Sequence, residues 1–359
     1  NDQLIYEEKD EGFTCGIDLS SDEKYFLIST SDHTTSEVYF FEANEINPKP
    51  KLFKKRQKEI KYSVDSWGKN FFIHTNLGAE DFKICKCKHD NIQEWQDYIH
   101  AKNGVLVGDF NFLNEWMIRS EVKNALSKIY VNNLKTNKEE ELIITDEKVI
   151  SPGAALMQKD RNTNKIYVSY HSPKTPGKTY IYDVFTKEKK LVKKEIIPSG
   201  HEPDNYIVER IDCNSHDGKK IPLTITRHKK TKLDGSANIL LYAYGSYGAS
   251  MGPFFSASRL SLIDRNIIWV TAHIRGGMEK GMNWWKEGKM LNKKNTFKDY
   301  ISSAKFLIEN KYTSKGQIIG MGGSAGGLLM GAAVNETPEL FLGMIMAVPF
   351  VDTLTTNLD

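Results

Sequence analysis

The chain has 359 residues, of which 40% are hydrophobic and 26% charged, a balance typical of a folded globular protein. Lys and Arg exceed Asp and Glu by only 49 − 46 = 3, which does not favour nucleic acid or an anionic membrane as a partner. No stretch approaches the length of a membrane span, and the first residues do not resemble a secretory signal peptide. We expect a cytoplasmic protein with two domains, residues 1–200 and 201–359.

The four cysteines are too few for a disulfide framework. Cys85 and Cys87 form a C-x-C pair, which on a strand would place both side chains on one face. No further ligands nearby complete a metal site, so we expect reduced cysteines and no metal or cofactor.

Strand-like runs recur at a regular interval in the first half. Aromatic-rich runs begin at residues 25, 71, 116 and 166, and each is followed by a polar turn and a second run, at residues 37–41, 81–85, 127–132 and 179–184. A strand–turn–strand unit repeated every 40–50 residues is typical of β-propeller blades. We therefore predict about four blades of an incomplete propeller, with residues 1–9 as the last strand of an earlier blade. A β-sandwich is the alternative, because its strands can have similar spacing.

The second half has a different pattern. Residues 206–212 and 221–228 flank a polar turn, which indicates a hairpin, and continuous apolar strands follow at residues 239–244, 267–272, 318–321 and 342–348. Helical segments are expected from Thr296, as a cap with Asp299 three residues on, and over residues 328–334. Apolar strands that alternate with helices predict a parallel α/β sheet.

A G-x-S-x-G pattern lies between the strand at 318 and the helix that follows it. Ser324 is its serine, and Gly322 and Gly326 are its flanking glycines. A serine in a strand–turn–helix is a nucleophile elbow, in which small neighbours allow the strand and helix to pass closely. A glycine-rich phosphate-binding turn is the alternative, but the Walker lysine and the dinucleotide spacing are absent.

An elbow serine needs oxyanion donors and a base. The backbone N–H of Ala325 is the expected first donor, and a tyrosine hydroxyl from the segment 242–248 is a candidate for the second, with aromatic packing as the alternative role. All nine histidines precede Ser324, whereas in this fold class the catalytic histidine follows the serine. His273 is the only histidine expected near the elbow, as an unusual base or, more simply, a structural residue.

The second half resembles the prolyl oligopeptidase family of serine peptidases, and in particular its oligopeptidase B (protease II) branch. The similarity runs through residues 244–250, 258–262, 274–277, 288–289, 294–300, 322–327 and 348–352. It implies a β-propeller that covers an α/β-hydrolase domain, with Ser324 as nucleophile and Tyr244 as the second oxyanion donor beside Ala325. It also implies that Met278 stands where the family usually has a third glycine, and that the catalytic Asp and His would follow residue 359.

The resemblance implies a serine oligopeptidase that cleaves short peptides after Arg or Lys through an acyl-enzyme on Ser324. We expect the chain to be an internal or truncated fragment, inactive alone, whose partners are short peptides or a complementary chain that carries the missing Asp and His. A non-catalytic remnant and another α/β hydrolase that acts on esters are the alternatives.

Overall fold

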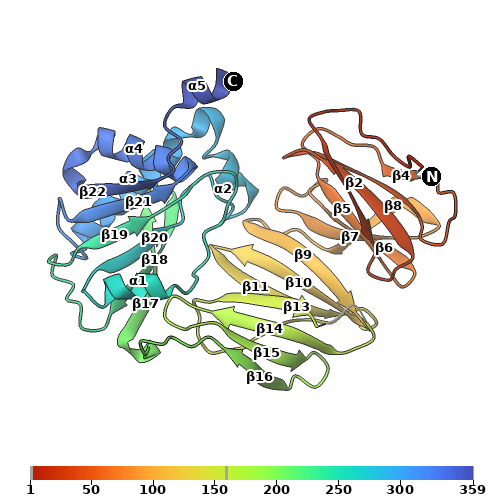
Figure 1. Cartoon of the computed structure of the whole chain (residues 1–359), viewed down its shortest axis with the longest axis horizontal. Helices are drawn as coiled ribbons and strands as arrows, with labels where there is room; N and C mark the ends of the chain where they lie inside the picture. Colours follow the sequence, from red (N-terminus) through yellow and green to blue (C-terminus); the bar gives the residue numbers. More distant parts are fainter. Residues whose placement is uncertain (1–2, 158–160, 359) are drawn as a thin grey trace.

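Each of the four strand-like runs in the first half forms the second strand of its own four-stranded antiparallel sheet (Figure 1). The computed structural model describes residues 3–157 and 161–358. Blade 1 contains β1 (Thr14–Leu19), β2 (Tyr25–Ser31), β3 (Ser36–Glu42) and β4 (Lys51–Lys54); blade 2 contains β5 (Tyr62–Trp67), β6 (Asn70–Thr75), β7 (Lys83–Lys88) and β8 (Asn91–Ile99); blade 3 contains β9 (Val105–Leu113), β10 (Trp116–Lys123), β11 (Leu126–Asn133) and β12 (Glu139–Glu141); blade 4 contains β13 (Ser151–Leu156), β14 (Lys165–His171), β15 (Lys178–Asp183) and β16 (Lys189–Lys194). Four separate sheets in chain order confirm the predicted partial propeller, whereas a β-sandwich would have two larger facing sheets.

Neighbouring blades pack through the apolar faces of their strands. Between blades 1 and 2, the buried ring of Phe71 lies 5.4 Å from that of Phe40 and 5.2 Å from that of Phe53, measured between ring centroids. Cys85 and Cys87 are buried in the same cluster. The described residues contain no group of acidic, His or Cys side chains that could hold a metal ion.

Residues 3–9 do not form the strand that was expected there. The segment is instead attached to blade 1, where Arg56 Nη2 donates to Glu8 Oε2 at 2.6 Å and the Tyr6 ring lies 4.8 Å from that of Tyr39. In the described part of the chain these residues pair with no strand. Residues 1–2 lie outside the described residues.

The second half forms one six-stranded sheet in the order β17-β18-β20-β19-β21-β22. Its elements are β17 (Tyr206–Asn214), β18 (Lys220–His228), β19 (Ile239–Tyr242), α1 (Ala257–Ile263), β20 (Ile268–Ala272), α2 (Met282–Lys286), α3 (Lys294–Glu309), β21 (Ile318–Gly323), α4 (Ala325–Glu336), β22 (Phe341–Ala347) and α5 (Thr353–Leu358). β20, β19, β21 and β22 are parallel, and the β17–β18 hairpin adds to them antiparallel, so the predicted α/β architecture is confirmed. No helix in the described part of the chain is both long and apolar enough to cross a membrane.

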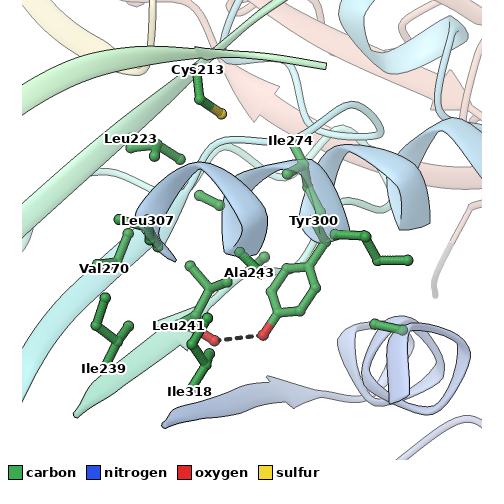
Figure 2. Close-up of a cluster of buried hydrophobic side chains, with 14 of the residues drawn as sticks. Cys213, Leu223, Ile239, Leu241, Ala243, Val270, Ile274, Tyr300, Leu307 and Ile318 are labelled. Carbon is green, nitrogen blue, oxygen red and sulfur yellow. Dashed lines mark hydrogen bonds between the residues drawn. The ribbon is translucent and has the colours of Figure 1, made fainter. Parts of the chain in front are cut away.

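The main core lies between the sheet and α3 (Figure 2). Tyr300 of α3 is fully buried, and its hydroxyl donates to the Leu241 carbonyl of β19 at 2.9 Å. Burying the aromatic ring stabilises the packing, and the hydrogen bond removes the cost of burying its hydroxyl. This contact fixes α3 against the strand that leads to Tyr244.

The predicted cap at Thr296 is wrong. α3 begins at Lys294, and Thr296 is a buried residue inside the helix. Its hydroxyl donates to the carbonyls of Arg275 and Gly288, at 2.9 and 3.1 Å. The carboxylate of Asp299 binds Arg275 instead of the helix start, because a buried guanidinium needs an anionic partner.

Candidate active site

Ser324 lies in the turn between β21 and α4, and its backbone has φ 55° and ψ −120°. This left-handed conformation is strained for a residue with a side chain. Hydrogen bonds hold it: the Ser324 N–H donates to the Ala347 carbonyl at 2.9 Å, and its carbonyl accepts from the N–H groups of Gly327 and Phe350 at 2.9 and 3.0 Å. Ser324 is exposed at the N-terminal end of α4, as a nucleophile elbow requires.

The two glycines beside the serine are needed for close backbone approach. A Cβ on Gly322 would lie 2.4 Å from the Gly326 carbonyl oxygen, and a Cβ on Gly326 would lie 3.1 Å from the Ala243 carbonyl oxygen. Both distances are shorter than ordinary van der Waals contacts. The glycines therefore let α4 start directly against β19 and β21, three residues earlier than the helix expected from the sequence.

Ala325 and Tyr244 meet at the same edge of the sheet. Ala325 is the first residue of α4, so its N–H has no acceptor within the helix. Tyr244 follows the end of β19, and its ring lies so near α4 that a Cβ on Gly326 would be 3.3 Å from Tyr244 Cδ2. The structure therefore brings together the residues that were predicted as nucleophile and oxyanion donors, at the carboxyl ends of parallel strands where α/β sheets bind ligands.

Residues 243–256, which we name the Tyr244 loop, connect β19 to α1 and are held by contacts that the sequence did not indicate. Lys293 Nζ donates to the Gly245 carbonyl and to Ser246 Oγ, both at 2.6 Å. Burial lowers the pKa of Lys293 to about 8. Gly276, with φ 102°, lies directly on this loop, because a Cβ there would be 2.0 Å from the Gly245 carbonyl oxygen.

A buried ion-pair network lies behind the loop. Arg275 is 1% exposed and binds Asp299 through Nη2–Oδ1 at 2.5 Å and Nε–Oδ2 at 2.8 Å, and its Nη1 donates to Asp217 Oδ2 at 2.6 Å. Burial alone would lower the pKa of Arg275, but the hydrogen bonds to Asp299 and Asp217 outweigh it and raise the pKa. The network connects the β17–β18 turn, α3 and the segment after β20 into one unit.

His273 does not lie toward the elbow. It is fully buried, with Nε2 2.7 Å from Thr224 Oγ1 and 2.9 Å from Arg210 Nη1. These partners are on β18 and β17, on the opposite side of β20 from β19 and β21. Burial, followed by the nearby Arg210 charge, lowers the pKa of His273 well below its usual value. His273 is thus a structural histidine, and among the described residues none is hydrogen-bonded to the Ser324 hydroxyl.

A cavity of about 840 Å³ lies between blades 1–3 and the α2 region. Its walls include His33 and His74 from the propeller and Met278 and Trp285 from the second domain. Ser324 does not line it, but Met278 lies against the Tyr244 loop, since a Cβ on Gly248 would be 2.3 Å from Met278 Cε. The cavity wall therefore reaches the loop that carries the candidate oxyanion donor.

Comparison with known proteins identifies the two halves. The model of the prolyl oligopeptidase N-terminal β-propeller domain matches residues 1–195, and that of the prolyl oligopeptidase family matches residues 253–359. The chain belongs to the prolyl oligopeptidase family. The match confirms the resemblance drawn from the motifs, and the family's N-terminal model extends it over the blades, where the sequence indicated little beyond architecture.

The chain is similar along its whole length to several family members. It is 38% identical to dipeptidyl aminopeptidase BI from Pseudoxanthomonas mexicana and 33% identical to protease 2 from Moraxella lacunata, in both cases over all of this chain and about half of the relative, 49% and 51%. The structure of oligopeptidase B from Trypanosoma brucei with covalently bound antipain superposes with a TM-score of 0.93, at 30% identity, over 99% of this chain and 52% of that one. The chain thus spans about half the length of the relatives it matches.

Proposed function

We propose that this chain carries the nucleophile and the oxyanion donors of a serine peptidase that hydrolyses short peptides. The observation that carries the proposal is the conformation of Ser324, an exposed serine with φ 55° between β21 and α4. Its neighbours Ala325 and Tyr244 lie where oxyanion donors are needed, and the named relatives are serine peptidases of the same family.

The proposed chemistry follows from these positions. Ser324 Oγ attacks the scissile carbonyl carbon as its proton passes to a base, and the carbonyl oxygen becomes an oxyanion. The Ala325 N–H and the Tyr244 hydroxyl would donate hydrogen bonds to that oxyanion. The carbon–nitrogen bond then breaks, and the amine leaves with the proton that the base received. Water hydrolyses the resulting ester and restores the serine.

The base is the component that these 359 residues do not supply. None of the nine histidines follows Ser324 in the sequence, and the one on a neighbouring strand, His273, bonds to β17 and β18. We therefore propose that the 359 residues alone have little or no peptidase activity, since loss of triad members costs roughly 10⁴–10⁶ in rate. The comparisons lend no support to a separate complementary chain as the source of the base.

For substrates, we propose cleavage after Arg or Lys, which rests on the similarity to protease 2 and oligopeptidase B. The 38% identity to dipeptidyl aminopeptidase BI favours a second candidate, release of dipeptides from a free N-terminus. The two differ in one requirement, because a dipeptidyl aminopeptidase needs the free amino group of its substrate and an endopeptidase does not.

The nucleophile is tested by fluorophosphonate labelling of the natural protein in extracts of the cells that make it. We expect the labelled peptide to contain Ser324, and the Ser324→Ala variant to lose the label. An unlabelled Ser324 peptide, in an extract whose other serine hydrolases are labelled, would contradict the proposal. Turnover of an Arg-amide by the purified 359-residue chain, abolished by Ser324→Ala, would refute its inactivity.

The substrate class is tested on the natural protein with aminoacyl-Arg amides, in which Arg is the second residue and the N-terminal amino group is either free or blocked, alongside Pro-amides and short esters. Comparable hydrolysis of both Arg-amides supports the endopeptidase. Hydrolysis of the free form only supports the dipeptidyl aminopeptidase. A preference for esters over every amide would contradict both and favour an esterase.

A further inference from the structure

The segment 276–282, which we name the docking segment, contacts the propeller on one side and the Tyr244 loop on the other. On the propeller side, Met282 N donates to Asp81 Oδ1 at 2.7 Å, and Ala125 N donates to the Glu279 carbonyl at 2.9 Å. On the loop side, Gly248 N donates to the Gly276 carbonyl at 2.9 Å. A single short segment therefore receives contacts from blades 2 and 3 and from the loop beside the elbow.

Glu279 makes both kinds of contact within one residue. Its backbone carbonyl accepts from Ala125, in the tip of the β10–β11 hairpin, and its carboxylate Oε1 accepts from Met251 N in the Tyr244 loop at 3.0 Å. The side chain is 2% exposed. Its Oε2 also lies beside Gly277, which itself adjoins the loop, because a Cβ on Gly277 would lie 2.0 Å from Glu279 Oε2 and 2.8 Å from the Ala249 carbonyl oxygen.

The other side of the hairpin tip is held by Arg210 of β17. Its Nη2 donates to the Asn124 carbonyl, and its Nη1 donates to Thr224 Oγ1 at 2.7 Å. Asn124 and Ala125 both have positive φ, 49° and 62°, as a tight hairpin turn requires. The tip is thus held between the half-buried guanidinium of Arg210 and the backbone of Glu279.

A buried carboxylate at this position needs an explanation other than stability. Burial raises the pKa of Glu279 to about 7, against the opposing effects of the Met251 hydrogen bond and the Arg210 charge. Oε2 has no hydrogen-bond partner in the described residues. Burying an incompletely paired carboxyl group costs free energy, and the hydrogen bond to Met251 N is a contact that a hydrophobic side chain could not make.

We propose that Glu279 is a positioning residue that couples docking of the propeller hairpin 124–125 to the conformation of the Tyr244 loop. Its backbone carbonyl accepts a hydrogen bond from the hairpin, and its carboxylate accepts one from the loop and so orders it. Its relevance to catalysis rests on the proposed function, in which the same loop presents Tyr244 to the oxyanion. The contact itself can be tested without any activity.

The experiment is hydrogen–deuterium exchange at the amides of Met251 and Ala125 in the natural protein and two variants. Glu279→Ala removes the carboxylate, and Glu279→Gln keeps an oxygen that can accept from Met251. Glu309→Gln, at an exposed position at the end of α3, is the matched control. We expect Glu279→Ala to speed exchange of both amides about tenfold, the scale of one lost hydrogen bond, and Glu279→Gln and Glu309→Gln to retain protection.

Ala125 decides the outcome, because its own acceptor is a backbone carbonyl that the substitution leaves in place. Faster exchange at Met251 with Ala125 unchanged would overturn the coupling. Equal loss of protection in the Gln and Ala variants would overturn the role of the carboxylate oxygen. Should the Ala variant also lose protection in blade 1, as in general unfolding, protection in the Gln variant becomes the deciding measurement.

Fluorophosphonate labelling of the same samples separates this proposal from the proposed function. Faster exchange at both amides in Glu279→Ala, with Ser324 unlabelled even in the natural protein, would support the coupling and contradict the proposed peptidase function. Labelled Ser324 with unchanged exchange in Glu279→Ala contradicts the coupling alone.

Discussion

Ser324 and Tyr244 lie at the same edge of the central sheet, but they are positioned in different ways. The elbow is held by the glycines two residues to either side of Ser324 and by the adjoining strand β22, whose Ala347 carbonyl accepts from the Ser324 N–H. The Tyr244 loop has no regular structure of its own between β19 and α1. It is held by Lys293 and by the segment that contains Gly276 and Glu279.

The difference means that the candidate nucleophile and the candidate oxyanion donor, although adjacent, depend largely on different parts of the chain. A change near residue 324 should affect the serine first. A change in the buried network at Arg275, or at the propeller contact, should affect the loop first. Loops are held less tightly than the elements they connect, so the loop is the half of the site that distant changes can disturb.

The largest expected effect is that of a substitution at Asp299, which binds Arg275 in the buried network behind the Tyr244 loop. Asp299→Ala leaves the Arg275 guanidinium buried with its main partner removed, and we expect a loss of about 3–5 kcal/mol in the free energy of unfolding. Chemical denaturation of the natural protein measures it. The double variant Arg275→Met/Asp299→Leu, which removes both charges, should recover most of the loss.

The matched control for Asp299→Ala is an exposed ion pair. Lys135 and Glu115 are in contact on the surface of blade 3, and Glu115→Ala should cost less than about 1 kcal/mol. An Asp299→Ala variant no less stable than this control would show that the network is not what holds the segment after β20.

Sequence patterns predicted the parts of the site and fold that depend on near neighbours. The second strands of all four blades follow from aromatic-rich runs that recur at a regular interval, and the elbow around Ser324 follows from a turn that needs glycine. The outer strands were missed, as for β16, whose six exposed residues carry four lysines and show no apolar alternation.

The contacts that hold the Tyr244 loop were missed for another reason: Lys293 lies 48 residues from Gly245, and Asp299 lies 24 residues from Arg275. No local pattern marks such pairs, and the three-residue spacing of Thr296 and Asp299 indicated a cap that the buried ion pair overrides.

Lys293 offers a pH-dependent test of the loop's support. Burial lowers its pKa from 10.5 in an exposed lysine to about 8, so the folded state binds fewer protons than the unfolded state between these values. The natural protein should therefore gain stability relative to Lys293→Met as pH rises from about 8 to 10.5, by about 3 kcal/mol. The neutral amine can still donate to Gly245 and Ser246. Denaturation of both proteins across this range measures the difference, and a constant difference would mean that the Lys293 charge carries no burial cost.

The smallest expected effects come from two glycines near the elbow that differ only in their surroundings. Gly322→Ala places a Cβ 2.4 Å from the Gly326 carbonyl oxygen, so the backbone must shift, and we expect a loss of about 1–3 kcal/mol together with slower fluorophosphonate labelling of Ser324. Gly331 lies in α4 with no atom within 4 Å of an added Cβ. Gly331→Ala should therefore stabilise the protein by about 0.5–1 kcal/mol, because alanine favours the helix, and should leave labelling unchanged. Equal effects of the two substitutions on labelling would mean that the elbow does not depend on the close approach of β21 and α4. The conclusion that the glycines beside Ser324 hold the serine in place would then be wrong.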